Sequence, residues 1–125
     1  MAEVSGKRSL ATGIASGDLN FADPANFRFL LKTGKDVHLC SASGQIAYGV
    51  LQNKPKNNEF ASVCVDGFTK FTAGGSIGAD VLVMTNNSGF GIAAASGGSV
   101  LGRVITGADS GLIGEMLFSF TGSGR

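Results

Sequence analysis

The stretch that decides the fold reads Gly49-Val50-Leu51-Gln52-Asn53, then a polar loop, then Ala61-Ser62-Val63-Cys64-Val65. The same phrase returns later in the chain. Gly102-Arg103-Val104-Ile105-Thr106 enters a turn and leads to Gly114-Glu115-Met116-Leu117-Phe118. Gly49 and Val65 are separated by the same number of residues as Gly102 and Phe118. The sequence therefore predicts two related β-hairpins within one domain.

Short apolar runs separated by glycine-bearing turns continue on both sides of this stretch. Their spacing predicts strands over residues 27–31, 37–40, 45–51, 60–65, 68–71, 81–84, 90–94, 100–105 and 112–120. Asp66-Gly67 has the composition of a compact turn, and residues 52–59 that of a long, exposed polar loop. No window shows an amphipathic helix with capping residues. The predicted fold class is all-β: a small β-barrel or β-sandwich built from two related hairpin units.

Residues 1–26 differ from the rest of the chain. Small and polar side chains dominate, and no helical or strand period is sustained. We therefore expect an extended N-terminal arm over residues 1–26 and a single β-domain over residues 27–125. Large apolar and basic residues along such an arm have no local core to join, so we expect them to contact a partner. These candidate contact residues are Lys7, Arg8, Leu10, Ile14 and Phe21. Deletion of residues 2–20 is expected to leave the domain folded.

Composition restricts the classes of function. Hydrophobic residues make up 43% of the 125 residues and charged residues 15%, the reverse of a disordered chain. The net charge of +1 argues against direct binding of nucleic acid, which needs a basic surface. No run approaches the roughly 20 apolar residues that a membrane helix needs, and no secretory signal is evident. A chain with so little charge could stay soluble by burying surface in a larger assembly.

The residues that carry chemistry are few, so we expect no enzyme, cofactor or metal site. The single histidine, His38, precedes Cys40 by two residues, but one strand supplies no third group to orient a nucleophile. One histidine and two cysteines are too few for a structural zinc site. Cys40 and Cys64 fit free buried thiols, and a disulfide between them remains open. Gly89-Phe90-Gly91 lacks the following helix that a phosphate-binding loop requires.

Glycines and aromatic residues are expected to serve the fold. Gly49, Gly67 and Gly102 are predicted to be structural positions in turns or bulges, where a side chain would obstruct the backbone. The nine phenylalanines and Tyr48 fall mostly in strand runs, so core packing is their expected role. Lys54 and Lys56 lie in the polar loop, where they either contact an acidic partner or are simply solvated.

The segment Gly49-Val50-Leu51, followed by the run from Ala61 to Gly75, resembles the capsid cement, or head decoration, proteins of tailed bacteriophages. Residues 78–83, Gly-Ala-Asp-Val-Leu-Val, and residues 101–104, Leu-Gly-Arg-Val, match two further features of that family. The resemblance covers residues 44–120 and rests on the order of these elements. One departure is Ala79, which stands between Gly78 and Asp80 where the family has glycine directly before the aspartate.

This resemblance implies a structural virion protein that binds the outer surface of the expanded capsid and stabilises it against the pressure of packaged DNA. It further implies the major capsid protein as partner, a homo-oligomer with a trimer favoured, and synthesis in the cytoplasm of a bacterial host. A different class stays open: a β-module on a virion that binds glycans or another host-surface group. That module would need an aromatic cluster on its exposed loops.

Overall fold

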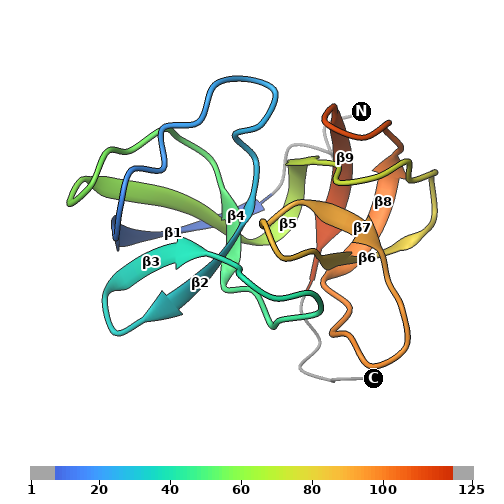
Figure 1. The fold of residues 1–125 in the computed structure, drawn as a ribbon, viewed down its shortest axis with the longest axis horizontal. Helices are drawn as coiled ribbons and strands as arrows, with labels where there is room; N and C mark the ends of the chain where they lie inside the picture. Colours follow the sequence, from blue (N-terminus) through green and yellow to red (C-terminus); the bar gives the residue numbers. More distant parts are fainter. Residues whose placement is uncertain (1–7, 120–125) are drawn as a thin grey trace.

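The computed structural model describes residues 8–119, which form nine strands and no helix (Figure 1). The strands are β1 (Arg8–Ala15), β2 (Phe29–Thr33), β3 (Asp36–Leu39), β4 (Gly49–Leu51), β5 (Phe60–Thr72), β6 (Leu82–Thr85), β7 (Gly91–Ala93), β8 (Gly102–Thr106) and β9 (Ile113–Phe118). They form one sheet in the order β1-β3-β2-β4-β5-β9-β8-β6-β7, with β1 also paired to β5. The predicted all-β class is confirmed.

The first five strands close into a small barrel. Antiparallel pairing joins β3 to β2, β2 to β4 and β4 to β5. Strand β1 completes the ring, because it pairs antiparallel with β5 and, at Ile14 and Ala15, parallel with β3. One core cluster fills this barrel, with Leu30, Val63 and Leu51 fully buried.

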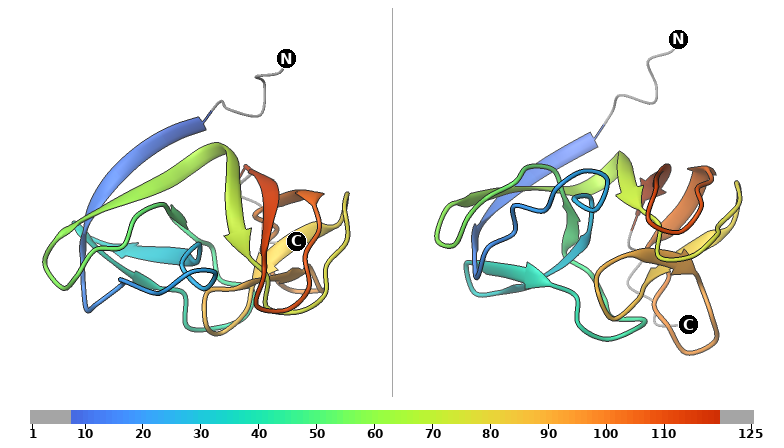
Figure 2. Two further views of the ribbon diagram at one scale, coloured as in Figure 1. Left: turned by 90° about the horizontal axis from the view of Figure 1, so that it is seen from above. Right: turned by 45° about the horizontal axis from the view of Figure 1, so that its top comes forward.

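The long strand β5 continues beyond this barrel and begins a second one. Its last residues pair with β9, and the ring runs through β8, β6 and β7. A bridge between Ala73, directly after β5, and Gly91 in β7 closes it. Figure 2 shows β5 bending sharply where it passes from one barrel to the other. The two barrels therefore share one strand as a common wall.

The bend lies at Gly67, and the predicted turn at Asp66-Gly67 is wrong. The chain does not reverse there, because each half of β5 has its own partner: Asp66 pairs with Ser9 of β1, and Phe68 pairs with Leu117 of β9. The pairing with β1 skips one residue at this point, which marks a bulge. Gly67 has a φ of 107°, a value that residues with a side chain rarely adopt. The Asp66-Gly67 sequence, typical of a turn, here forms a bend within a continuous strand.

The two predicted hairpins are confirmed, and their registers match. Val50 pairs with Cys64 in the first hairpin and Arg103 pairs with Leu117 in the second, with equal separation along the chain. Gly49 and Gly102 occupy the same place in each. A Cβ atom at either position would lie inside van der Waals contact of a carbonyl oxygen on the opposite strand.

Residues 8–15 form a strand, so the expectation that the N-terminal segment lacks a strand period is wrong for them. The inward residues Ala11, Gly13 and Ala15 are small, because β3 and β5 approach closely on both sides. A Cβ atom on Gly13 would lie 2.5 Å from Cγ1 of Val37. The larger residue Leu10 points outward and is exposed. The strand thus reverses the usual pattern of large apolar residues inside.

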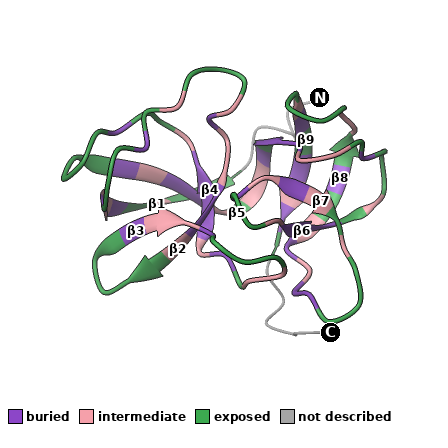
Figure 3. Cartoon of the chain, in the orientation of Figure 1, coloured by how far each residue is buried: buried purple, intermediate pink, exposed green. Residues whose placement is uncertain are grey.

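The cores of the two barrels meet at the seam between them. The larger cluster includes Phe29 and Val50 from the first barrel and Phe71, Met116 and Phe118 from the second. The rings of Phe29 and Phe118 pack with centroids 6.2 Å apart. Figure 3 shows buried residues gathered where β4, β5 and β9 approach one another. This continuous apolar contact makes the two barrels one packed unit.

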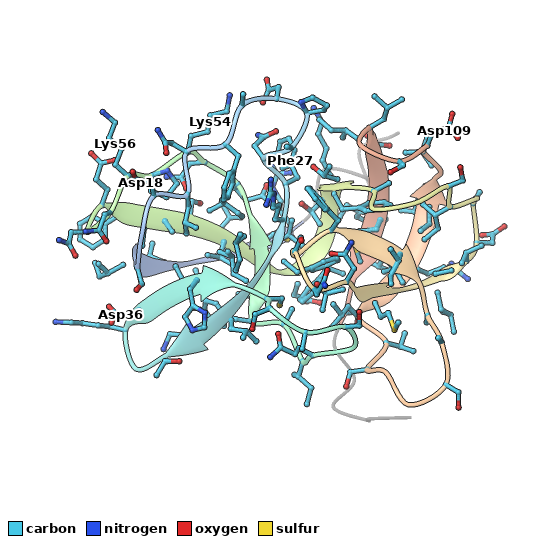
Figure 4. The ribbon with its side chains drawn as sticks, viewed as in Figure 1. Asp18, Phe27, Asp36, Lys54, Lys56 and Asp109 are labelled. Atoms are coloured by element: carbon cyan, nitrogen blue, oxygen red, sulfur yellow. The ribbon has the colours of Figure 1, made fainter. Side chains whose placement is uncertain are left out.

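The β4–β5 loop is polar, as predicted, but it is held in place. Its Pro55 is buried, and the Pro55 carbonyl accepts a hydrogen bond from the Leu19 amide. The backbone amide of Asn57 donates a hydrogen bond to the Asp18 carboxylate at 2.9 Å. Lys54 forms an exposed ion pair with Asp23 at 3.0 Å. Figure 4 labels Lys54, Lys56 and Asp18 at this end of the molecule. The loop therefore has internal partners for much of its polarity.

Candidate partner-binding surface

The outer face of β1 carries large apolar side chains that no other part of residues 8–119 covers fully. Leu10 is 56% exposed, and Ile14 is half-buried. Ile14 pairs directly with Phe60 of β5, and directly paired residues of antiparallel strands lie on the same face. Phe60 is 71% exposed, the largest value among the exposed hydrophobic residues of the described chain. Exposed apolar residues at both ends of β1 are unusual on an outer sheet face, where polar residues normally alternate with the core.

A shallow groove lies at the Ile14 end of β1. Ile14 and Phe60 form its apolar wall, and Lys32 and Lys35 of the β2–β3 hairpin form the opposite wall. The Lys32 ammonium donates to the Gly34 carbonyl at 2.5 Å and lies 5.6 Å from the centre of the Tyr48 ring. Apolar side chains next to basic ones suit a protein surface that offers both apolar and acidic groups.

A narrower cleft lies at the other end of β1, over the seam between the barrels. It has a volume of about 120 Å³. Strands β1, β5, β8 and β9 supply its lining, which comprises Arg8, Phe68, Thr69, Lys70, Ile105, Glu115 and Met116. A second depression lies beside it and shares Arg8 and Phe68. Strand β1 thus connects two indentations of the surface, with Arg8 at one and Ile14 at the other.

The predicted contact residues divide into three groups. Arg8, Leu10 and Ile14 lie together on β1, whereas Lys7 falls outside the described residues. Phe21 lies apart from them, because its ring stacks on the guanidinium of Arg28 at 4.0 Å from the ring centre. Phe90 covers the other side of that guanidinium at 4.2 Å. Phe21 therefore has an internal partner that its sequence context did not reveal.

Arg28 binds the two barrels together through this stack. Its Nε donates to the Ala25 carbonyl at 2.8 Å, and its Nη1 donates to the Ser88 carbonyl at 3.4 Å. Burial lowers the pKa of the guanidinium from its ordinary value, because desolvation disfavours the charged form. Two aromatic faces and two carbonyl oxygens compensate for that desolvation. The role of this arginine is structural.

Exposed apolar residues beyond the predicted set also line the surface. Core packing holds for Phe29, Phe71 and Phe118, but it is the wrong expectation for Phe60. A signal was present, because Phe60 shares its strand parity with Ser62, whereas Ala61 and Val63 form the buried side. Ile105 of β8 is 42% exposed. Its exposure was not predictable, because it lies in an apolar run in which either face of the strand could have been the buried one.

The thiols are positioned as structural groups. Cys40 and Cys64 are both free and buried, so the disulfide left open by the sequence is absent. Burial raises the pKa of Cys40 to about 12, and burial likewise raises the pKa of Cys64. The reactive thiolate is therefore scarce at neutral pH. His38 lies near Thr33, with 3.4 Å between Nε2 and Oγ1.

Two further observations concern the described residues alone. Within residues 8–119, no cluster of three or more histidine, cysteine or acidic side chains is arranged to hold a metal ion. In the same range, no helix has the length and apolar character needed to cross a membrane.

Comparison with known proteins identifies the fold. No protein-family model matches the chain, and no curated protein sequence is similar to it. Among solved structures, the chain is similar to the head fiber gp8.5 N base of bacteriophage phi29, with a TM-score of 0.70 and 16% identity. The match covers 90% of this chain and 95% of that one, so it includes both barrels. At this identity the likeness shows a shared fold.

Proposed function

We propose that this protein is a structural component of a bacteriophage virion that binds the outer surface of the capsid. The observation that carries this proposal is the match of nearly the whole two-barrel fold to a phage head-fiber base. The resemblance of residues 44–120 to capsid decoration proteins supports the same assignment from the sequence. The exposed apolar surface on β1 and β5 supplies a physical means of attachment.

The partner in this proposal is the major capsid protein, contacted through Arg8, Leu10 and Ile14 of β1 together with Phe60 of β5. A protein that binds only the expanded shell stabilises that shell by mass action, against the pressure of packaged DNA. Many copies bound at repeated sites add their contributions, so each contact need not be strong. We further propose a homo-oligomer, with a trimer as the first state to test.

A second role, favoured by the description of the phi29 protein, is that of a base that holds a fibre on the head. Both roles require attachment to the shell, so one experiment tests their common step. A glycan-binding module is the alternative from another class. Within residues 8–119 the surface offers one highly exposed aromatic ring, Phe60, whereas sugar recognition favours several stacked aromatic residues.

The test is co-sedimentation of the purified protein with expanded shells of its own phage, compared with unexpanded procapsids. Saturable binding to expanded shells supports the proposal and gives the number of copies bound. Binding to neither particle contradicts it and would direct the next experiment to a glycan array. Sedimentation equilibrium of the free protein measures the oligomeric state separately.

A matched pair of variants tests the β1 surface. Leu10→Ser removes an exposed leucine from β1, and Ile46→Ser removes an exposed isoleucine, 53% accessible, from the β3–β4 loop. Weaker shell binding for Leu10→Ser alone, with both variants melting like the wild type, supports attachment through β1. Equal binding by the two variants would place the attachment surface elsewhere.

A further inference from the structure

The lining of the cleft over the seam between the barrels combines apolar and charged side chains. Phe68 is half-buried and Ile105 is exposed, and Met116 lies beneath them, fully buried. An engineered cavity of roughly 150 Å³ binds benzene, so a cleft of about 120 Å³ suits one branched aliphatic side chain.

The rim carries more positive than negative charge. Arg8 and Lys70 are exposed on it, and Glu115 is the one carboxylate that lines the cleft. Glu115 already accepts a hydrogen bond from the Thr106 hydroxyl at 3.3 Å. Within residues 8–119 the one ion pair joins Lys54 to Asp23, so in that range neither Arg8 nor Lys70 has a carboxylate in salt-bridge contact. Among the described residues, no carboxylate therefore competes as an ion-pair partner with an incoming anion.

Lys70 is placed to respond to such an anion. It stands opposite Glu115 in the β5–β9 ladder, and its ammonium lies 5.8 Å from the centre of the Phe27 ring. A cation over a ring at this distance on an exposed surface gains little stability from the contact. A carboxylate beside the cleft would compete readily with that contact.

We infer that this cleft binds an aliphatic side chain, flanked by a carboxylate, from the shell protein. The inference rests on the proposed function and adds to it the chemistry of the segment that is recognised. The aliphatic group packs on Phe68 and Ile105, while the carboxylate lies between Arg8 and Lys70. The cations give orientation and salt dependence, and the contacts with Phe68 and Ile105 give most of the affinity.

Four variants in two matched pairs test this inference by co-sedimentation with expanded shells. Ile105→Ser is paired with Leu112→Ser, which removes a 53% exposed leucine outside the cleft, in the β8–β9 turn. Lys70→Glu is paired with Lys56→Glu, which changes an exposed lysine of the β4–β5 loop, outside the cleft (Figure 4). Melting temperatures close to that of the wild type establish that each variant is folded.

Ile105→Ser should bind shells roughly tenfold to a hundredfold more weakly, the effect of losing a buried aliphatic side chain. Lys70→Glu should weaken binding and flatten its dependence on salt between 50 and 200 mM NaCl, a range over which the Debye length changes by roughly twofold. Both control variants should bind like the wild type. This pattern supports an acidic, aliphatic segment as the occupant.

Other outcomes overturn the inference in distinguishable ways. Wild-type binding by both cleft variants removes the cleft from the interface and leaves the proposed function intact. A change in oligomeric mass with unchanged shell binding assigns the cleft to a second copy of the chain instead. Failure of the wild-type protein to bind shells removes the proposed function, and this inference with it.

Discussion

Gly102 lies at the start of β8, where the two strands of the second hairpin are closest, and Gly102→Ala tests why it must be glycine. The added Cβ atom would overlap the carbonyl oxygen of Leu117 on β9 and would lie 2.8 Å from Cε of Met116. Met116 is fully buried in the core, so its side chain has little room to move. The backbones of β8 and β9 must therefore separate.

The magnitude follows from two contributions. Separation weakens the ladder at the Gly102–Phe118 pair, and each hydrogen bond there contributes about 1 kcal/mol. Overpacking against a fixed core residue lowers the unfolding free energy by about 1–3 kcal/mol more. The sum is about 3 kcal/mol of unfolding free energy. For a domain of this size, 1 kcal/mol lowers Tm by roughly 3–5 °C, so the variant should melt roughly 10 °C below the wild type.

Thermal unfolding followed by circular dichroism measures this difference. Gly78→Ala is the control, because an added Cβ atom there meets no heavy atom of residues 8–119 within 4 Å. Gly49→Ala should behave like Gly102→Ala, since its Cβ atom would overlap the Cys64 carbonyl in the related hairpin. If Gly102→Ala melts within about 2 °C of Gly78→Ala, the close approach of the strands is not what requires glycine.

Three further predictions concern the seam, a buried thiol and the β4–β5 loop. Arg28→Ala removes the guanidinium that stacks on Phe21 and Phe90, and it should lower the unfolding free energy, measured in urea, by about 2 kcal/mol. An unchanged urea midpoint would show that the stack contributes nothing to stability. The pKa of Cys40 is raised from 9.0 to about 12, so the stability that its protonated form contributes is complete below pH 9 and is lost as the pH rises toward 12. From pH 8 to pH 10 the wild type should therefore lose about 1 kcal/mol more than Cys40→Ala, and equal losses would refute this assignment. Lys54→Ala breaks an exposed ion pair and should change stability by no more than about 0.5 kcal/mol in the same urea titration.

The local parts of this fold were predictable from sequence, and the closure of the barrels was not. The hairpin around Gly102 was found because both of its strands and its turn lie within one short window. The pairing of β1 with β3 and β5 joins residues far apart in sequence, and no local pattern reports it. Strand β1 was also missed because its own inward residues, such as Gly13 and Ala15, are small and give no apolar strand period. The same reasoning reverses one expectation. Deletion of residues 2–20 removes this wall and the buried Leu19, so we now expect that deletion to unfold the first barrel.

The candidate surface was predicted in part, for a physical reason that also supports its role. Leu10 and Ile14 were selected because large apolar residues on a polar segment had no evident core to join. In the structure β1 contributes only small residues to that core, and Leu10 points outward. Phe21 met the same criterion but has Arg28 as an internal partner, a contact between segments that the sequence does not specify. The criterion therefore finds apolar residues that have no partner nearby in the sequence. Only the fold shows which of them, such as Phe21, have a partner from a distant segment.

The distribution of the exposed apolar residues argues that β1 and its neighbours, and not the loops, form the binding surface. Ile46 and Leu112 are as exposed as Leu10, but each stands alone on a connecting segment, which is common on soluble proteins. Leu10, Ile14 and Phe60 instead share the paired strands β1 and β5. A strand packs rigidly against its neighbours, so side chains on it reach a partner with less loss of conformational freedom than side chains on a loop. A small rigid patch of this kind gives modest affinity for a single copy, which suits the repeated attachment over a symmetric shell that we propose.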